Sequence, residues 1–298
     1  MTICSPATRC RLAFGITSRT TFDRNNNRPV VLRHSGALLF SVQLDPSTVG
    51  LAMCRFLCLG FLLIANTLFL RADAPSLCAS FDSQIEALDV KGARQSIEQA
   101  YKEAPSSYDV LYRMARLNII LGDQEKVEDN KLPYYTKGVE FADKALAANG
   151  KGMSGYVYRA AANGKVALFK GIFSVGGIVN KVRDDAWSAI KLNNETTQRL
   201  ASAHYILGRA HLNLTKKPKL VRYPLGLAWG NIEEAYDHLK KARELRSEFI
   251  MFELEYARVL IAMDREEEGK AIARKIAGLS LKEPGDKERK NDALELLK

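Results

Sequence analysis

The sequence has no cysteine after Cys78 and no lysine before Lys91. The last 220 residues can therefore hold neither a disulfide nor a cysteine-based zinc site. Residues 91–298 contain 22 lysines, so the lysine-free start indicates a segment of different origin from the main body. Sustained alternation of apolar and polar residues, the pattern of a half-buried strand, is also absent from Ser80 onward.

The segment before the main body has the pattern of a targeting signal. Residues 53–74 combine Arg55, an apolar run of 15 residues at 56–70, and the sequence Ala72-Asp73-Ala74, which together form a secretory signal peptide with cleavage expected after Ala74. The run is short for a membrane span, which needs about 20 residues. We expect residues 1–52 to be an over-extended or disordered leader, residues 53–74 to be a signal peptide, and the protein to be exported and periplasmic. Two alternatives stay open: an organellar transit peptide, suggested by the arginines of residues 1–52, and an uncleaved N-terminal membrane anchor.

The net charge of +10 is divided between two dissimilar regions. Residues 1–74 contain eight arginines and three acidic residues, and residues 75–298 contain 36 basic and 31 acidic residues. The main body is thus mildly basic with interspersed charges, whereas a surface that follows nucleic-acid phosphates gathers its cations on one face. The composition argues against a nucleic-acid partner.

From Ser80 onward proline occurs only at breaks in the helical pattern, where its missing N–H and fixed φ do not disturb a helix. Between those breaks the apolar residues have helical spacing. This pattern predicts an all-α fold. The five prolines are Pro105, Pro133, Pro218, Pro224 and Pro284.

A pattern of small and apolar residues at i, i+4 and i+7 recurs along the main body. Each such helix follows another helix that carries one small residue near its middle, and small residues allow close packing of paired helices. The later helices carry Gly138, Ala142 and Ala145, then Val182, Ala186 and Ala189, then Ala235, Leu239 and Ala242; the earlier helices carry Ala115, Ala160, Gly208 and Ala257.

These repeats resemble tetratricopeptide repeats, which are helix pairs of about 34 residues. His204, Leu207, Gly208 and His211 fall on repeat positions 4, 7, 8 and 11. Two insertions depart from the repeat length: the stretch from Gly122 to Gly138 is about 11 residues too long, and the stretch after His211 about 15. The resemblance implies an α-solenoid of four to five degenerate helix pairs over residues 75–298.

The order of motifs also resembles the regulator of microtubule dynamics family over residues 105–280. It consists of Leu-Tyr-Arg-Met-Ala-Arg at 111–116, Tyr134-Tyr135, Phe169-Lys-Gly-Ile-Phe, and Ala-His-Tyr-Ile-Leu-Gly-Arg at 203–209 before a long loop. The resemblance implies a degenerate tetratricopeptide-type solenoid, associated with microtubules or with organelle contact sites.

Two histidines could indicate a metal site, but their spacing argues against it. His204 and His211 are seven residues apart, or about 10 Å along a helix, with no acidic residue nearby. We interpret them as packing residues. The sequence also lacks a Gly-x-Ser-x-Gly elbow and a His-Glu-x-x-His motif. We expect no metal, no cofactor and no enzyme activity, and an unrecognised hydrolase is the third-ranked alternative.

Arginines at repeat position 9 are the candidate binding residues, because this position faces the concave groove of tetratricopeptide-like repeats. Guanidinium groups suit carboxylates of a bound peptide, and tyrosines at position 5 could add apolar contact. The alternative is that each arginine pairs with an acidic residue of the next repeat. The candidates are Arg116, Arg209 and Arg258, with Arg159 near the same place, and Tyr112 and Tyr205.

A basic loop with interleaved apolar residues lies inside the second insertion. It carries Lys216, Lys217, Lys219 and Arg222. Long insertions often carry function, so the loop predicts peripheral contact with an acidic lipid surface or with an acidic partner. The alternative is an ordinary solvated loop.

Together these patterns predict a non-catalytic adaptor or assembly factor that binds a protein or peptide. The first alternative is a structural protein of the regulator of microtubule dynamics type, with microtubules as partners only if the protein is not exported.

Overall fold

The computed structural model describes residues 73–170 and 174–298, so the expected leader and most of the expected signal peptide lie outside the described residues. The described part is helical and has no strand, as expected for an all-α fold. Its α-helices, in chain order, are α2 (Ala74–Glu86), α3 (Val90–Glu103), α4 (Tyr108–Gln124), α5 (Lys131–Ala148), α6 (Met153–Val166), α7 (Gly176–Leu192), α8 (Thr197–Thr215), α9 (Lys219–Arg222), α10 (Ile232–Leu245), α11 (Ile250–Ala262), α12 (Glu266–Ile276) and α13 (Asp286–Glu295). Short 3₁₀ turns η1 (Glu128–Asn130), η2 (Ala167–Phe169) and η3 (Tyr223–Leu225) occur between them.

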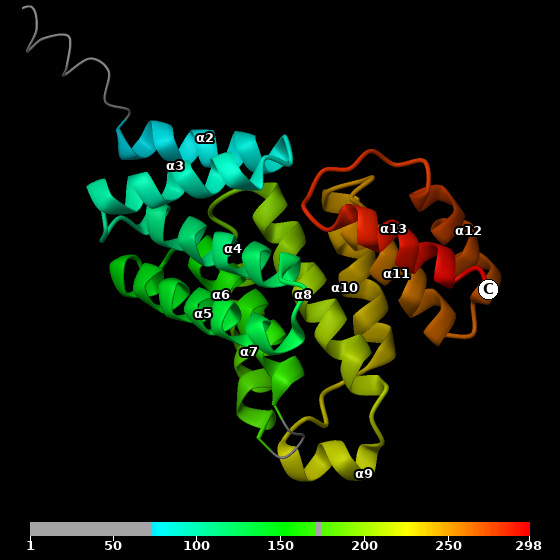
Figure 1. Cartoon of the computed structure of the whole chain (residues 1–298). Helices are drawn as coiled ribbons and strands as arrows, with labels where there is room; N and C mark the ends of the chain where they lie inside the picture. The colour runs from blue at the N-terminus through cyan, green and yellow to red at the C-terminus, as the bar shows by residue number, and fades with distance from the viewer. Residues whose placement is uncertain (1–72, 171–173) are drawn as a thin grey trace, which may run out of the picture. The chain divides into compact units, whose positions relative to one another are not determined.

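The helices of the unit that spans residues 68–298 pack as successive antiparallel pairs (Figure 1). The pairs in the described residues are α2/α3, α4/α5, α6/α7, α8/α10 and α11/α12, and α13 packs on α11 and α12. The first helices of successive pairs also contact one another, from α2 through α4, α6 and α8 to α11. This arrangement is the α-solenoid predicted from the repeats.

The small residues of the repeat pattern lie at the contacts within and between pairs. Ala115, Ala160, Ala257 and Ala235 are all fully buried. At Gly208 a Cβ atom would lie 2.8 Å from Leu239 Cγ and 3.1 Å from the Ala235 carbonyl oxygen. The backbones of α8 and α10 therefore approach each other closely at this residue. The predicted register of these helices is therefore confirmed.

The second insertion forms α9 and η3, between α8 and its partner α10. Leu227 beyond it is buried, and Trp229 Nε1 donates a hydrogen bond to Asn180 Oδ1 on α7 at 2.8 Å. The insertion is thus anchored on the preceding pair. Within residues 73–170 and 174–298 no helix has the length and apolar character needed to cross a membrane.

Candidate functional site: an arginine-lined groove

A cavity of about 850 Å³ runs along the first helices of the pairs. We call it the groove. Its lining includes residues of α2, α4, α6, α8 and α11, and of the C-terminal segment at 283–292. Ten basic and six acidic side chains line it, so it has an excess of positive charge.

The groove brings together three of the four predicted arginines. Arg116, Arg209 and Arg258 line it, as does Tyr205. Arg159 does not; its guanidinium donates hydrogen bonds to Asp185 at 2.7 and 2.8 Å and to Asp143 at 2.9 Å, which join α6 to α7 and α5. Tyr112 lies behind the lining, where its ring stacks on Tyr158 at 5.9 Å between centroids.

The three predicted groove arginines are already paired with carboxylates of the chain itself. Arg116 contacts Glu283 at 2.8 Å and Asp82 at 3.4 Å. Glu255 lies 3.6 Å from Arg209 and 2.7 Å from Arg258, and Arg258 also reaches Asp292 at 2.8 Å. Arg209 thus pairs with an acidic residue of the next helix pair, as the alternative had it, whereas the carboxylates beside Arg116 and Arg258 come from other parts of the chain.

Besides Arg222 of the basic loop, two further arginines line the groove without a carboxylate partner in the part of the chain that the structure describes. They are Arg199, in the first turn of α8, and Arg246, the C-cap residue of α10. Arg199 Nε donates a hydrogen bond to Ser154 Oγ at 3.0 Å, and its guanidinium carbon lies 4.9 Å from the centre of the Tyr158 ring. The Arg246 guanidinium carbon lies 3.6 Å from the centre of the Phe249 ring.

Arg246 is held at an electrostatic cost. Burial lowers the pKa of Arg246; among the neighbouring charges, Glu283 and Glu86 raise that pKa, and Arg116 and Arg199 lower it. Because Arg116 and Arg199 repel the buried Arg246 cation, a ligand carboxylate placed among the three arginines would relieve this repulsion. This end of the groove is therefore the one suited to an anion.

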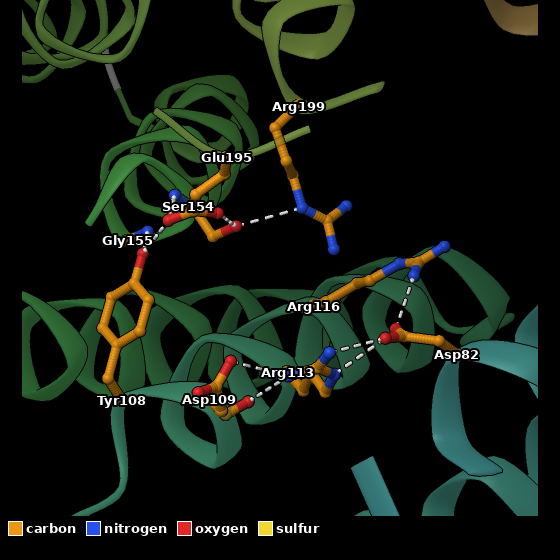
Figure 2. A network of polar contacts seen from close by, with 9 residues as sticks. All are labelled: Asp82, Tyr108, Asp109, Arg113, Arg116, Ser154, Gly155, Glu195 and Arg199. Carbon is orange, nitrogen blue, oxygen red and sulfur yellow. Dashed lines mark hydrogen bonds and ion pairs between the residues drawn. The ribbon is translucent and has the colours of Figure 1, made fainter. Parts of the chain in front are cut away.

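A polar network positions Arg199 above Arg116 (Figure 2). Glu195, in the α7–α8 connection, accepts hydrogen bonds from the Tyr108 hydroxyl at 2.7 Å, from the Ser154 backbone N–H at 3.0 Å and from the Ser154 hydroxyl. Burial opposes the Glu195 charge, but the bonds from Ser154 and Tyr108 hold the pKa of Glu195 below its ordinary value. The carboxylate thus caps the start of α6 and fixes the Ser154 hydroxyl that receives Arg199.

Arg116 is oriented from the other side by Asp82 on α2. The same carboxylate receives Arg113 Nη2 at 2.7 Å, so Asp82 joins two arginines of α4 (Figure 2). The Arg116 and Arg199 side chains extend from α4 and α8 into the space between these helices and both line the groove.

A sequence model described as "Regulator of microtubule dynamics protein 1-3" matches residues 77–298, nearly the whole described unit. The chain belongs to this family. The match extends the resemblance found at residues 105–280 in both directions. No curated protein sequence matches the chain.

Two solved structures show what this family member is similar to. The protein TTC0263 of Thermus thermophilus, a thermophilic TPR protein, is 21% identical, with 72% of this chain and 95% of that chain covered and a TM-score of 0.50. MamA of Desulfovibrio magneticus RS-1 is 14% identical, with 75% and 94% covered and a TM-score of 0.39. At 21% identity the likeness to TTC0263 concerns the fold alone.

The three histidines of the described residues lie together between α8 and α10. His204 and His211 of α8 both face His238 of α10, with 2.9 Å between His204 Nδ1 and His238 Nδ1. The His211 ring stands edge-on to Trp229 at 4.9 Å between centroids, and His211 Nδ1 accepts a hydrogen bond from the Asn231 N–H. They fill the space between the paired helices, as the repeat positions predicted.

The basic loop differs from expectation at one residue. Lys216, Lys217 and Lys219 are exposed, but Arg222 is only 6% exposed and donates to the Gly230 carbonyl oxygen at 2.9 Å. The reason is that residues 219–222 form the single helical turn α9, and its inner side carries Val221 and Arg222, which both line the groove. Arg222 therefore anchors the loop and does not extend its basic surface.

Proposed function

We propose that the groove binds an acidic segment of a protein partner, without catalysis. The observation that carries the proposal is the pair Arg199 and Arg246, which line a groove without carboxylate partners among the described residues. Guanidinium groups bind carboxylates through charge-assisted, often bidentate hydrogen bonds. The fold of helical repeats is the kind that presents extended concave binding surfaces.

Aromatic rings beside these cations support the same function. Tyr158 and Phe249 lie under Arg199 and Arg246 and line the groove with them. Interfaces take much of their affinity from such aromatic and arginine residues. A segment with acidic residues beside apolar ones would therefore satisfy both the cations and the rings.

The test is binding of labelled peptides by the full chain, measured by fluorescence anisotropy. A peptide of alternating Glu and Leu should bind, and its analogue with Gln in place of Glu should bind at least about tenfold more weakly, a difference in binding free energy of about 1.4 kcal/mol. The double variant Arg199→Ala with Arg246→Ala should bind the two peptides equally. The matched control is Arg94→Ala with Arg274→Ala, two exposed arginines outside the groove.

A non-catalytic role is part of this proposal. The polar network includes the serine–glutamate pair Ser154 and Glu195, which a hydrolase would need to expose, but Ser154 is fully buried. The pair also has a structural task at the start of α6. Equal binding of Glu and Gln peptides by the wild-type chain would contradict the acidic-segment proposal.

Microtubules are a second candidate partner, supported by the name of the family to which the chain belongs. The test is co-sedimentation of the full chain with two kinds of microtubule, one with the acidic tubulin tails and one without them. Binding that depends on the tails and on Arg199 would make tubulin a source of the acidic segment. Co-sedimentation that stays negative would remove the microtubule candidate while leaving the peptide result unaffected.

Export stays a proposal that rests on the sequence of residues 53–74. One contact argues against cleavage after Ala74: the Asp73 side chain accepts a hydrogen bond from the Ser76 N–H at 3.0 Å and caps α2. An N-cap is worth about 1 kcal/mol, and a new amino group at a helix start is unfavourable. Mass spectrometry of the mature N-terminus decides the matter, because a start at Pro75 would support export and an uncleaved start would contradict it.

A further inference from the structure

The end of the molecule at α9 carries the most exposed large apolar side chains of the described residues. Leu220 is 86% exposed, Leu168 67% and Tyr223 60%. Four exposed lysines accompany them, and we call the whole set the α9 tip. It consists of Leu168, Lys170, Lys216, Lys217, Lys219, Leu220 and Tyr223.

The residues of the α9 tip belong to two long stretches of the sequence that contain no acidic residue. One runs from residue 144 to residue 183 and the other from residue 196 to residue 232. They meet where Trp229 hydrogen-bonds Asn180 and where Gly176 approaches the Leu225 carbonyl oxygen. The rest of the main body interleaves acidic with basic residues, so the tip is a local region of one charge sign.

The lysines of the tip have no ion-pair partner among the residues that the structure describes. Many other exposed basic residues do, for example Lys270 with Glu266 at 2.7 Å. The tip is also firmly seated, because Arg222 beneath it is buried and bonded to Gly230 and Leu227 is 3% exposed. The exposed lysines and apolar side chains of the tip are therefore attached to a well-packed part of the fold.

We propose that the α9 tip docks on the surface of a membrane that contains anionic lipids. Lysines next to such a surface are attracted by its negative potential, and apolar side chains between them can enter the headgroup boundary. An exposed leucine beside three lysines gains nothing from nucleic-acid phosphates, which the lysines alone would serve. Contact here is peripheral, in keeping with the lack of a membrane-crossing helix in residues 73–170 and 174–298.

The test is flotation of the full chain with vesicles of phosphatidylcholine, alone or mixed with phosphatidylserine. The measured quantity is the ratio of binding to the two vesicle types, compared between variants, because residues 1–74 with their eight arginines contribute equally to every variant. Lys216→Gln, Lys217→Gln and Lys219→Gln together should lower that ratio by up to about a hundredfold, since each surface lysine contributes about fivefold. The control triple, Lys102→Gln with Lys240→Gln and Lys241→Gln, removes the same charge from other exposed sites and should leave the ratio within about twofold.

A second variant separates insertion from charge. Leu220→Ser with Tyr223→Ser keeps every lysine, so it should retain binding at low salt and lose it at high salt, where the lysine attraction is screened. Hydrogen exchange of residues 216–225 should slow when the mixed vesicles are added. Equal loss in the control triple, or unchanged exchange in this segment, would overturn the proposal.

The membrane test can be separated from the peptide test by the choice of variants. Arg199→Ala with Arg246→Ala should leave vesicle binding unchanged, and Lys216→Gln with Lys219→Gln, two residues that do not line the groove, should leave peptide binding unchanged. Binding of the tip to polyglutamate without binding to the mixed vesicles would assign it to an acidic protein and would also overturn the membrane proposal.

Discussion

At the scale of single residues, close helix packing depends on the absence of one atom at Gly208. A Cβ there would lie 2.8 Å from Leu239 Cγ, and the backbone of α10 is 3.1 Å away. Other pairs hold alanine at the corresponding place, for example Ala115 and Ala257. The α8/α10 pair is thus packed too closely for even the methyl group that these pairs accommodate.

Gly208→Ala should lower the free energy of unfolding by about 1 kcal/mol, because overpacking of ~1–3 kcal/mol exceeds the ~1 kcal/mol gained in helix propensity. The matched control is Gly164→Ala in α6, where a Cβ meets nothing within 4 Å. That change should stabilise the protein by about 0.5–1 kcal/mol. Urea denaturation measures both; a stabilised Gly208→Ala variant would show that α8 and α10 can separate freely.

The histidine cluster makes stability depend on pH. Burial, with the neighbouring His238, lowers the pKa of His204 and of His211 from 6.5 to about 4, and burial also lowers the pKa of His238. The folded state therefore keeps these rings neutral while the unfolded chain takes up protons below pH 6.5. Stability should be complete above that pH and fall as the pH drops toward about 4.

Between about pH 7 and about pH 5 the loss should be on the order of 1 kcal/mol each for His204 and His211, with allowance for partial exposure. His211→Asn should unfold with a shallower pH dependence than the wild type in urea titrations over that window. Carboxylates contribute equally to both proteins and cancel in the comparison. A pH dependence that is the same in both would mean that His211 is protonated in the folded state.

At the scale of helices, the repeats were predictable because packing leaves a periodic trace in the sequence. Small residues at i, i+4 and i+7 mark α5, α7 and α10, and the excess length after His211 marks the α9 insertion. The unpaired cations were not predictable in this way. Arg199 and Arg246 lie at helix ends, outside the position-9 register, and their lack of partners depends on contacts between distant segments.

The C-terminal segment provides one such contact. Glu283 follows α12 and precedes α13, yet its carboxylate lies 2.8 Å from Arg116 of α4, inside the groove. The segment is fixed by Asp286, which is fully buried and accepts the N–H groups of Lys282 and Glu283 at 2.9 Å. Glu283 therefore occupies the place that a ligand carboxylate would take beside Arg116.

Glu283→Gln should release Arg116 and raise the affinity for the Glu-Leu peptide several-fold, about 0.5–1 kcal/mol. Anisotropy titrations measure it. Glu288→Gln is the control, because it removes the same charge from an exposed site on α13. Weaker binding by the Glu283 variant would mean that the segment shapes the groove and does not compete for it.

At the scale of the whole repeat domain, the ion pair between Arg116 and Glu283 joins helix pairs that are not neighbours in the array. In a linear array each repeat contacts only its neighbours, and stability is a sum of local terms. Here Arg116 belongs to the second helix pair and Glu283 follows the fifth, 167 residues further along the chain. Early and late pairs of the array are thus linked directly across the groove.

This link predicts long-range coupling, which a double-mutant cycle in urea can measure. Arg116→Ala and Glu283→Ala should show a coupling energy of about 1–2 kcal/mol, because both side chains are less than a fifth exposed, at 13% and 17%. The exposed pair Arg94 and Glu98, at 53% and 44%, should couple by only about 0.3–0.5 kcal/mol. If the Arg116 cycle gives the same small value, the ends of the array unfold independently, and the groove is open on one side in solution.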